Sequence, residues 1–450
     1  MEQFVTKFHG GSHLVRKGAP PKEMQDPPKH VTKAYAPIHF VAKNVTGSLP
    51  RNGGEILFNP AVVHWKNDLY LCSYRVFVRY ADLDTRRYDK TPYFNPNHPW
   101  LGNKPSQTFW ASPKEGGGYD VTRLVLARIM DREEPEILTV FSDQPRVDAR
   151  LFKLREDRFA MTGNSSHWIY DQNLGLKNGN CRSRNGCMLM FSRVLTLRDN
   201  RLRDDAEIVD GSVDLFIGDS LVMCPQFSGR MEKNWSMWRA NGDAGYGEPN
   251  GELLVSTWIS PRHEVFHLDV SGDKIECPTI EHVTRGENIL GRIAKYYNKV
   301  LHVSLSTPAL AARLDDGTVD DSRRIAFGHV KYVYKHIKDV PRGSPLTSFH
   351  KLLVEKKKHF HPTYVYLMYI YEFEATPPYR VTRVSDFFLP ETSWSLVFAN
   401  SLTWSPEQRS YVMAYGDHDN QCWLLYMTPT EVENALRTIR DPRSAHFLLL

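Results

Sequence analysis

The chain has 450 residues, and 57 Lys and Arg against 52 Asp and Glu give a formal net charge of +5. Hydrophobic residues make up 41% and charged residues 24%, which excludes a disordered or fibrous chain. A charge this small over this length gives no indication of a nucleic-acid partner.

Proline-rich sequence without hydrophobic periodicity predicts an irregular N-terminal arm over residues 1–50. Beyond the arm, short apolar or alternating runs rich in β-branched and aromatic residues are bounded by Gly, Asn, Asp or Pro, which predicts β-strands. Such runs lie at residues 68–80, 123–130, 187–197, 252–259, 364–374, 410–416 and 422–427.

Two segments have a helical pattern. Residues 291–300 fit a turn and strand equally well. Residues 429–441 have Thr430 as a candidate N-cap and Glu433 three residues later. The sequence therefore predicts an almost entirely β-structured protein.

A loose unit recurs along the chain: a polar motif, a β-run, a turn and a second β-run. It starts at Asn59, Asp148, Lys233, Ser306 and Asn400. Five such units of four strands predict one all-β domain over residues 51–441, a five-bladed β-propeller with an insertion at about 335–362 in blade four. Residues 442–450 would form a C-terminal tail.

Secretion and membrane signals are not seen in the sequence. The N-terminal segment has no apolar core of a signal peptide, and no apolar run reaches the roughly 18 residues of a membrane helix. The 6 cysteines are scattered without a Cys-x-x-Cys pair. We therefore expect a cytoplasmic protein with reduced thiols and no membrane span, and without a metal or cofactor. The oligomeric state stays open.

Polar motifs stand where the units begin, and the blades of a propeller converge on its axis, so these side chains are expected to meet in one central pocket. The two-residue period of a strand would place Asp148 and Arg150 on the same side. The motifs are Asn59-Pro60 and Tyr74-Arg75, then Asp148-Ala149-Arg150, then Lys233-Asn234, then Ser306-Thr307-Pro308 and Phe327-Gly328-His329, then Tyr415-Gly416-Asp417-His418-Asp419.

The order of these motifs resembles that of the five-bladed propellers of glycoside hydrolase family 130, the β-mannoside phosphorylases, and their β-1,2-mannosyltransferase relatives. The resemblance spans about residues 55–435. It implies an inverting enzyme that acts on β-linked mannose or a similar sugar by transfer or phosphorolysis, with phosphate or a nucleotide sugar as co-substrate. It also implies that Asp148 is the general acid/base, acting through a sugar hydroxyl.

The resemblance assigns the other motif residues to substrate binding. It departs from the family at Ala149, where proline is usual, and at Val147, where an acid is usual. Arg193 and Arg239 match the family's phosphate-binding arginines only loosely. Positive charge for an anionic partner would come from Arg150, Lys233 and His329. Sugar hydroxyls would be held by Asn59, Tyr74 and Asp419. The remaining candidate substrate-binding residues are Arg75, Asn234 and Asp417.

Each of these residues also has an ordinary structural interpretation. Asp148 and Arg150 could form a same-face ion pair, Asp417 and Asp419 could cap a turn, and His329 could be a core histidine. The sequence therefore leaves open a catalytically inactive glycan- or protein-binding propeller, a structural scaffold and a glycoside hydrolase. The candidates for a sugar-stacking ring are Trp235, Trp238 and Trp258, although tryptophans are more often core residues.

Overall fold

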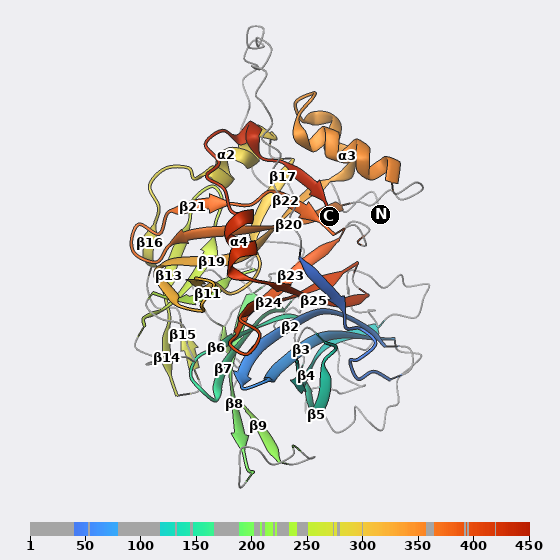
Figure 1. The fold of residues 1–450 in the computed structure, drawn as a ribbon, viewed down its shortest axis with the longest axis vertical. Helices are drawn as coiled ribbons and strands as arrows, with labels where there is room; N and C mark the ends of the chain where they lie inside the picture. The colour runs from blue at the N-terminus through green and yellow to red at the C-terminus, as the bar shows by residue number, and fades with distance from the viewer. Residues whose placement is uncertain are drawn as a thin grey trace, which may run out of the picture. The chain divides into compact units, whose positions relative to one another are not determined.

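The computed structural model describes residues 40–52, 55–79, 118–130, 133–144, 147–165, 189–201, 208, 212–218, 221–222, 234–240, 251–272, 274–276, 280–298, 300–356, 364–390, 393, 396–418 and 420–450. They belong to one compact unit, Ile38–Leu450. The strands of this unit form five sheets of four or more strands and one two-stranded ribbon among the described residues (Figure 1).

The first three sheets follow one another along the chain. The first contains β2 (Ile56–Lys66), β3 (Leu69–Arg79), β4 (Gly118–Arg128) and β5 (Glu136–Gln144) in that order. The second contains β6 (Val147–Lys153), β7 (Arg158–Ser165), β8 (Leu189–Asp199) and β10 (Leu221–Val222), with β9 (Val213–Ile217) also paired to β8. The third contains β11 (Ser236–Arg239), β12 (Leu253–Trp258), β13 (Glu264–His267) and β16 (Ile280–Val283), and β14 (Asp269–Ser271) pairs with β15 (Lys274–Glu276) as a ribbon.

The last two sheets contain strands from distant parts of the chain. The fourth runs β17 (Leu301–Leu305), β19 (Val319–Val333), β20 (Tyr364–Glu374), β22 (Phe387–Leu389) and β26 (Phe447–Leu449), with β18 (Leu310–Arg313) on β19 and β21 (Val381–Val384) on β20. The fifth runs β23 (Val397–Ser405), β24 (Ser410–Asp417), β25 (Gln421–Met427) and β1 (Val41–Asn44). The described helices are α2 (Ile289–Tyr296), α3 (Pro345–Lys356), α4 (Pro429–Ala435), η6 (Tyr334–Asp339) and η7 (Pro442–Ser444).

Local sequence explains how the first hairpin turns. Asn67 and Asp68 separate β2 from β3, and Asn67 has a φ of 50°. Two-residue hairpin loops need positive φ, and asparagine tolerates it better than most residues do. The hairpin brings Val62 opposite Cys72 and Val63 opposite Leu71, so apolar side chains cover both faces of the sheet.

The hydrophobic core lies between successive sheets. One cluster joins the first and second sheets, a second cluster joins the second and third, and a larger one joins the third, fourth and fifth. A further cluster joins the fifth sheet back to the first, for example through Val412, Leu424 and Val62. The five sheets therefore pack in cyclic order, which is the packing of a propeller.

The prediction of an all-β protein with a propeller arrangement is confirmed. The number of blades differs, because four blades are recognised in the structure and the sequence predicted five. The fourth sheet departs most from a four-stranded blade. β17 and β18 pair with successive parts of β19, and β22 pairs with β26 in parallel. These additional pairings extend the fourth sheet beyond the four strands that define a blade.

Both ends of the chain contribute to the sheets. Within the predicted arm, residues 41–44 form β1, which pairs antiparallel with β25 and lies beside it in Figure 1. Within the predicted tail, residues 447–449 form β26. The predicted insertion contains η6 and α3, and α3 buries Leu346, Phe349 and Leu353.

The C-terminal helix begins earlier and is shorter than the sequence predicted. Thr428, not Thr430, is the N-cap, and Glu431 completes the capping box. The helix ends at Ala435 because Leu436 takes an extended conformation, and Arg437 then bridges to Val384. No helix among the described residues is long and apolar enough to cross a membrane.

Candidate functional site

The polar motifs coincide with irregularities in the central strands. Asn59 and Asn234 have φ angles of 48° and 67°, a left-handed backbone that few other residues tolerate. Bulges re-aim side chains and are frequent next to functional sites. The register of strand pairing shifts at three places: between Phe58 and Ala61 on β2, between Val147 and Arg150 on β6, and between Ala399 and Ser401 on β23.

Arg150 is the centre of the candidate site. Its side chain is only 1% exposed although it carries a permanent charge. Its Nη2 donates a hydrogen bond to Asn234 Oδ1 at 2.8 Å, and its Nε donates to the carbonyl oxygen of Ser306. The guanidinium also lies 5.5 Å from the centroid of the Phe398 ring. Arg150 therefore brings together residues of the second, third, fourth and fifth sheets.

His329 joins this cluster through Ser306. The Ser306 hydroxyl and His329 Nδ1 are 2.7 Å apart and hydrogen bonded, and both residues are buried. The imidazole stacks with Tyr366 at 5.6 Å and packs against Phe398 at 5.0 Å. Ser306 thus contacts Arg150 through its carbonyl and His329 through its hydroxyl, so these two residues share one anchor.

Asn59 lies against the motif of the fifth sheet. A Cβ on Gly416 would be 2.2 Å from Asn59 Oδ1 and 2.8 Å from its backbone nitrogen, so only glycine allows this approach. Gly416 is the register partner of Phe398, which links this contact to Arg150. The neighbouring Asp417 is 2% exposed and accepts a hydrogen bond from the Ser393 hydroxyl at 2.5 Å.

Tyr74 and Arg75 lie on β3, and their described contacts are local. The Tyr74 hydroxyl donates to the Pro50 carbonyl at 2.8 Å, and burial raises the pKa of this phenol. The Arg75 guanidinium lies 4.7 Å from the Phe58 ring centroid. Their side chains therefore pack within the first sheet and its approach segment.

Asp148 lies at the second position of β6. Its backbone lies in β6 beside Arg150, and its side chain, like Lys233 and Asp419, is outside the described residues. The pairing shift between Val147 and Arg150 interrupts the two-residue alternation, so the predicted same-side relation to Arg150 cannot be taken from the strand period.

The loosely matched arginines lie elsewhere in the sheets. Arg193 is buried on β8, the third strand of its sheet. Arg239 ends β11 and donates to the carbonyls of Gly251 and Leu154. Since Asn234 precedes β11 and Arg239 ends it, Arg239 belongs to the opposite end of this strand from Asn234.

His263 is hydrogen bonded within the core on both ring nitrogens. The Ser256 hydroxyl lies 2.7 Å from His263 Nε2, and Nδ1 lies 2.9 Å from the Tyr379 carbonyl. Because Tyr379 offers only an acceptor there, Nδ1 carries the proton and Nε2 accepts from Ser256. No cluster that could hold a metal ion is found among the described side chains.

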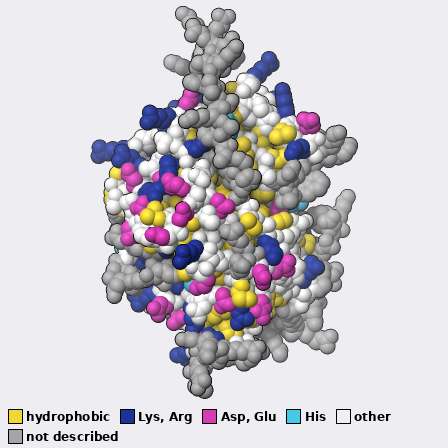
Figure 2. Space-filling model, viewed as in Figure 1, with side chains coloured by type: hydrophobic (Ala, Val, Ile, Leu, Met, Phe, Trp, Pro, Cys, Tyr) yellow, Lys and Arg dark blue, Asp and Glu magenta, His cyan; other side chains and the backbone are white. Residues whose placement is uncertain are grey.

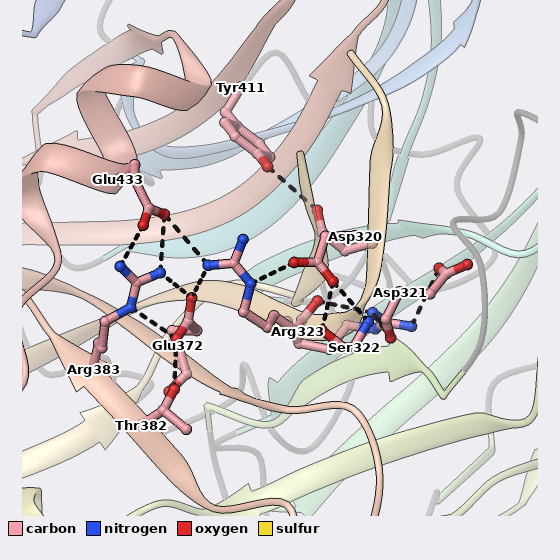
Figure 3. A network of polar contacts seen from close by, with 11 residues as sticks. Asp320, Asp321, Ser322, Arg323, Glu372, Thr382, Arg383, Tyr411 and Glu433 are labelled. Atoms are coloured by element: carbon pink, nitrogen blue, oxygen red, sulfur yellow. Dashed lines mark hydrogen bonds and ion pairs between the residues drawn. The ribbon is translucent and has the colours of Figure 1, made fainter. Parts of the chain in front are cut away.

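A separate polar network binds the fourth sheet to α4 and differs from the Arg150 cluster (Figure 3). Arg383 and Arg323 both contact the carboxylates of Glu372 and Glu433. Burial alone would raise the pKa of Glu372, but hydrogen bonds from Arg383 and Thr382 lower it. Cations and carboxylates neutralise one another here, as in a structural network.

A second buried network was missed by the sequence reasoning. Arg123 on β4 contacts Glu55 at 2.8 Å and Asp143 at 2.8 Å. Burial would raise the pKa of Glu55, but hydrogen bonds from Arg123 and Asn52 lower it to about 2. An arginine at the start of the apolar run of residues 123–130 was the available signal. Phe398 was also missed, because an aromatic residue in a strand resembles any core residue.

Comparisons with known proteins give a distant likeness. No protein family model matches the chain, and no curated protein matches its sequence. A glycosyl hydrolase from Bacteroides ovatus has a TM-score of 0.48 at 11% identity, over 92% of this chain and 98% of that one. A mannose phosphorylase from Leishmania mexicana has 0.37 at 11%, over 88% and 90%. A GDP-Man-dependent mannosyltransferase from Leishmania mexicana has 0.37 at 10%, over 88% and 88%. These three proteins are carbohydrate-active enzymes.

Proposed function

We propose that this chain is a carbohydrate-active enzyme that transfers a β-linked mannosyl or similar sugar unit with inversion, with phosphate or a nucleotide sugar as co-substrate. We also propose that its five sheets act as five blades around this site. The cyclic order of the hydrophobic clusters supports the blade count, since each cluster joins neighbouring sheets.

One observation carries the functional proposal: the buried cluster of Arg150, Asn234, Ser306 and His329. These residues come from three repeats, with Ser306 and His329 in the same one, and hydrogen bonds bring them together. A guanidinium is permanently charged and its planar fork of donors matches phosphate oxygens, so Arg150 supports an anionic partner. Phosphate and the diphosphate of a nucleotide sugar are partners of that kind.

The reaction needs a proton at the bridging oxygen. In phosphorolysis, phosphate attacks the anomeric carbon from one face, the glycosidic bond breaks on the other, and the leaving oxygen takes up a proton. Asp148 is the proposed source of that proton, acting through a sugar hydroxyl. Its backbone position beside Arg150 supports this assignment, because the acid would then lie near the proposed anion site.

A sugar-binding propeller without catalysis is the second candidate. Arg150, Asn234 and His329 are buried and already hydrogen bonded within the protein, which favours a supporting role for them. In such a protein the cluster would shape the pocket, and no bond would be broken. Binding without turnover would distinguish this candidate from the enzyme.

Turnover assays test the proposal directly. The protein is incubated with mannose 1-phosphate, GDP-mannose and β-mannosides, and the release of phosphate or GDP and the transfer products are followed. We expect turnover of at least one pair of substrates, and a decrease in kcat of about 100-fold or more for Asp148→Asn, the range for a lost general acid/base.

The matched control is Asp269→Asn, because Asp269 is exposed on the ribbon strand β14. It makes the same chemical change away from the cluster and should leave kcat unaltered. Equal turnover by Asp148→Asn and wild type would refute the catalytic role, and no turnover by wild type would refute the enzyme.

A further inference from the structure

The third sheet contains the three tryptophans that the sequence offered as stacking surfaces, and the structure separates them. Trp235 and Trp238 are 2% and 0% exposed, whereas Trp258 is 42% exposed. A large aromatic ring held at the surface loses the favourable free energy of burial. Trp258 is therefore the one of these three that remains accessible to a ligand.

Trp258 lies at the end of the third sheet that carries Asn234. β11 and β12 are antiparallel, with Ser236 opposite Ser256. Trp258 lies two residues beyond Ser256, and Asn234 lies two residues before Ser236. Both residues thus lie at the same end of this strand pair, and Asn234 is the residue that receives the hydrogen bond from Arg150.

A bulge sets the direction of Trp258. The pairing of β12 with β13 shifts between Ser256 and Trp258, so Thr257 is the additional residue. Trp258 is consequently opposite Glu264, and cross-strand partners share one face of a sheet. Glu264 is half-buried, and its carboxylate can accept hydrogen bonds from hydroxyl groups.

The hairpin that carries this pair is anchored from behind. Its loop carbonyls accept from the N-cap of α2, with Asn288 Nδ2 donating to Ile259 and Asn288 N–H donating to Pro261. His263 adds hydrogen bonds to Ser256 and Tyr379 within the core. Gly291 completes the contact, since a Cβ there would be 2.8 Å from the Pro261 carbonyl oxygen. Such anchoring holds Trp258 and Glu264 in place before a ligand arrives.

We propose that Trp258 and Glu264 form a subsite for a pyranose ring, in which the indole packs on the apolar C–H face of the sugar and the carboxylate accepts from its hydroxyls. The proposal rests on the proposed function for the kind of sugar, a β-linked mannoside. The Arg150 cluster would bind the anionic group, and the subsite would bind a neutral sugar unit next to it.

Calorimetric titration with β-mannobiose tests the subsite. We expect Trp258→Ala to weaken binding about tenfold, the order of magnitude of one aromatic contact, and Trp258→Phe to weaken it less. Glu264→Gln should weaken binding while keeping the shape of the site. Thermal unfolding should change little, because Trp258 is exposed and Glu264 is only half-buried. The control is Phe216→Ala, an equally exposed ring on β9 of the second sheet, which should bind as wild type does.

The outcomes separate the subsite from the enzyme. If wild type binds β-mannobiose without turnover and Trp258→Ala loses binding, the subsite stands and the proposed enzyme fails. If wild type turns over β-mannosides and Trp258→Ala keeps the same KM and Kd, the subsite fails and the enzyme stands. If wild type neither binds nor turns over β-mannosides, both proposals fail.

Discussion

The two ends of the central strands β2, β6 and β11 both contain buried cations, but they hold them differently. At the end of these strands away from the motifs, called the far end below, a cationic side chain of one sheet donates to backbone carbonyls of the preceding sheet. Lys153 Nζ donates to the Trp65 carbonyl at 2.6 Å, Arg239 donates to the Leu154 carbonyl, and Arg324 donates to the carbonyls of Arg239 and Ala240, both at 2.7 Å. At the motif end, Arg150 reaches past the third sheet to Ser306 in the fourth, and also contacts the side chain of Asn234.

The difference follows from the backbone. Where a strand ends regularly, its last carbonyls need partners, and a long cationic side chain from the next sheet satisfies them. Where bulges interrupt the ladder, side chains join the backbone as hydrogen-bonding partners, and several repeats converge on one point. The far end is therefore expected to contribute stability and the motif end to contribute function. Figure 2 shows charges of both signs interspersed over the visible described surface, so neither role depends on a large patch of one sign there.

Removal of the far-end contacts should have the largest effect on stability. Arg324→Leu deletes hydrogen bonds to the carbonyls of Arg239, Ala240 and Asp321 and leaves buried acceptors without donors. We expect the free energy of unfolding to decrease by about 3–5 kcal/mol, the range for breaking a buried charged contact. Urea unfolding measures it, and Arg262→Leu, at an exposed position, serves as the control. An equal effect of both variants would show that the inter-sheet contacts are dispensable.

A methyl group at the motif end should separate the first and fifth sheets. Gly416→Ala places its Cβ against Asn59, and overpacking of this kind destabilises by about 1–3 kcal/mol. Turnover or sugar binding should fall by more than the loss of folded protein explains, because Asn59 and Phe398 shift together. Gly47→Ala is the matched control, since nothing lies within 4 Å of a Cβ there. Wild-type activity in Gly416→Ala would contradict the placement of the site.

Lowering the pH should decrease the free energy of unfolding, because His263 in the hairpin at the motif end is less easily protonated when folded. Burial lowers the pKa of His263 from 6.5 to about 4, so between these pH values the unfolded chain binds a proton that the folded chain does not. Stability should therefore decrease as the pH falls from about 6.5 to about 4, by at most ~1.4 kcal/mol per pH unit. Urea unfolding at pH 7 and pH 5 measures this decrease, and it should be smaller in His263→Gln.

Between pH 6.5 and pH 4, Lys153 at the far end should not change the free energy of unfolding. Burial lowers the pKa of Lys153 to about 8, so this lysine stays charged in both states below pH 6.5 and adds no pH dependence there. If His263→Gln and wild type lost stability in parallel between pH 7 and pH 5, another group would be responsible.

The sequence predicted the strands and the positions of the motifs because both depend on local properties. Alternating apolar residues mark a strand wherever it packs, whereas the positive φ angles of Asn59 and Asn234 are seen only in the structure. The partners of Arg150 could not be predicted in the same way. Asn234 and Ser306 are 84 and 156 residues away, and only the packing of the sheets brings them into contact.

By itself the sequence determined an all-β chain with recurring polar motifs and three candidate stacking tryptophans. Only the tertiary structure decided that Trp235 and Trp238 belong to the core while Trp258 is accessible, and that Tyr74 donates to Pro50. It also decided that residues 41–44 complete the last sheet. The physical reason is that burial and hydrogen-bond partners are properties of the neighbours in space, whereas hydrophobic period and turn propensity are properties of the neighbours in sequence.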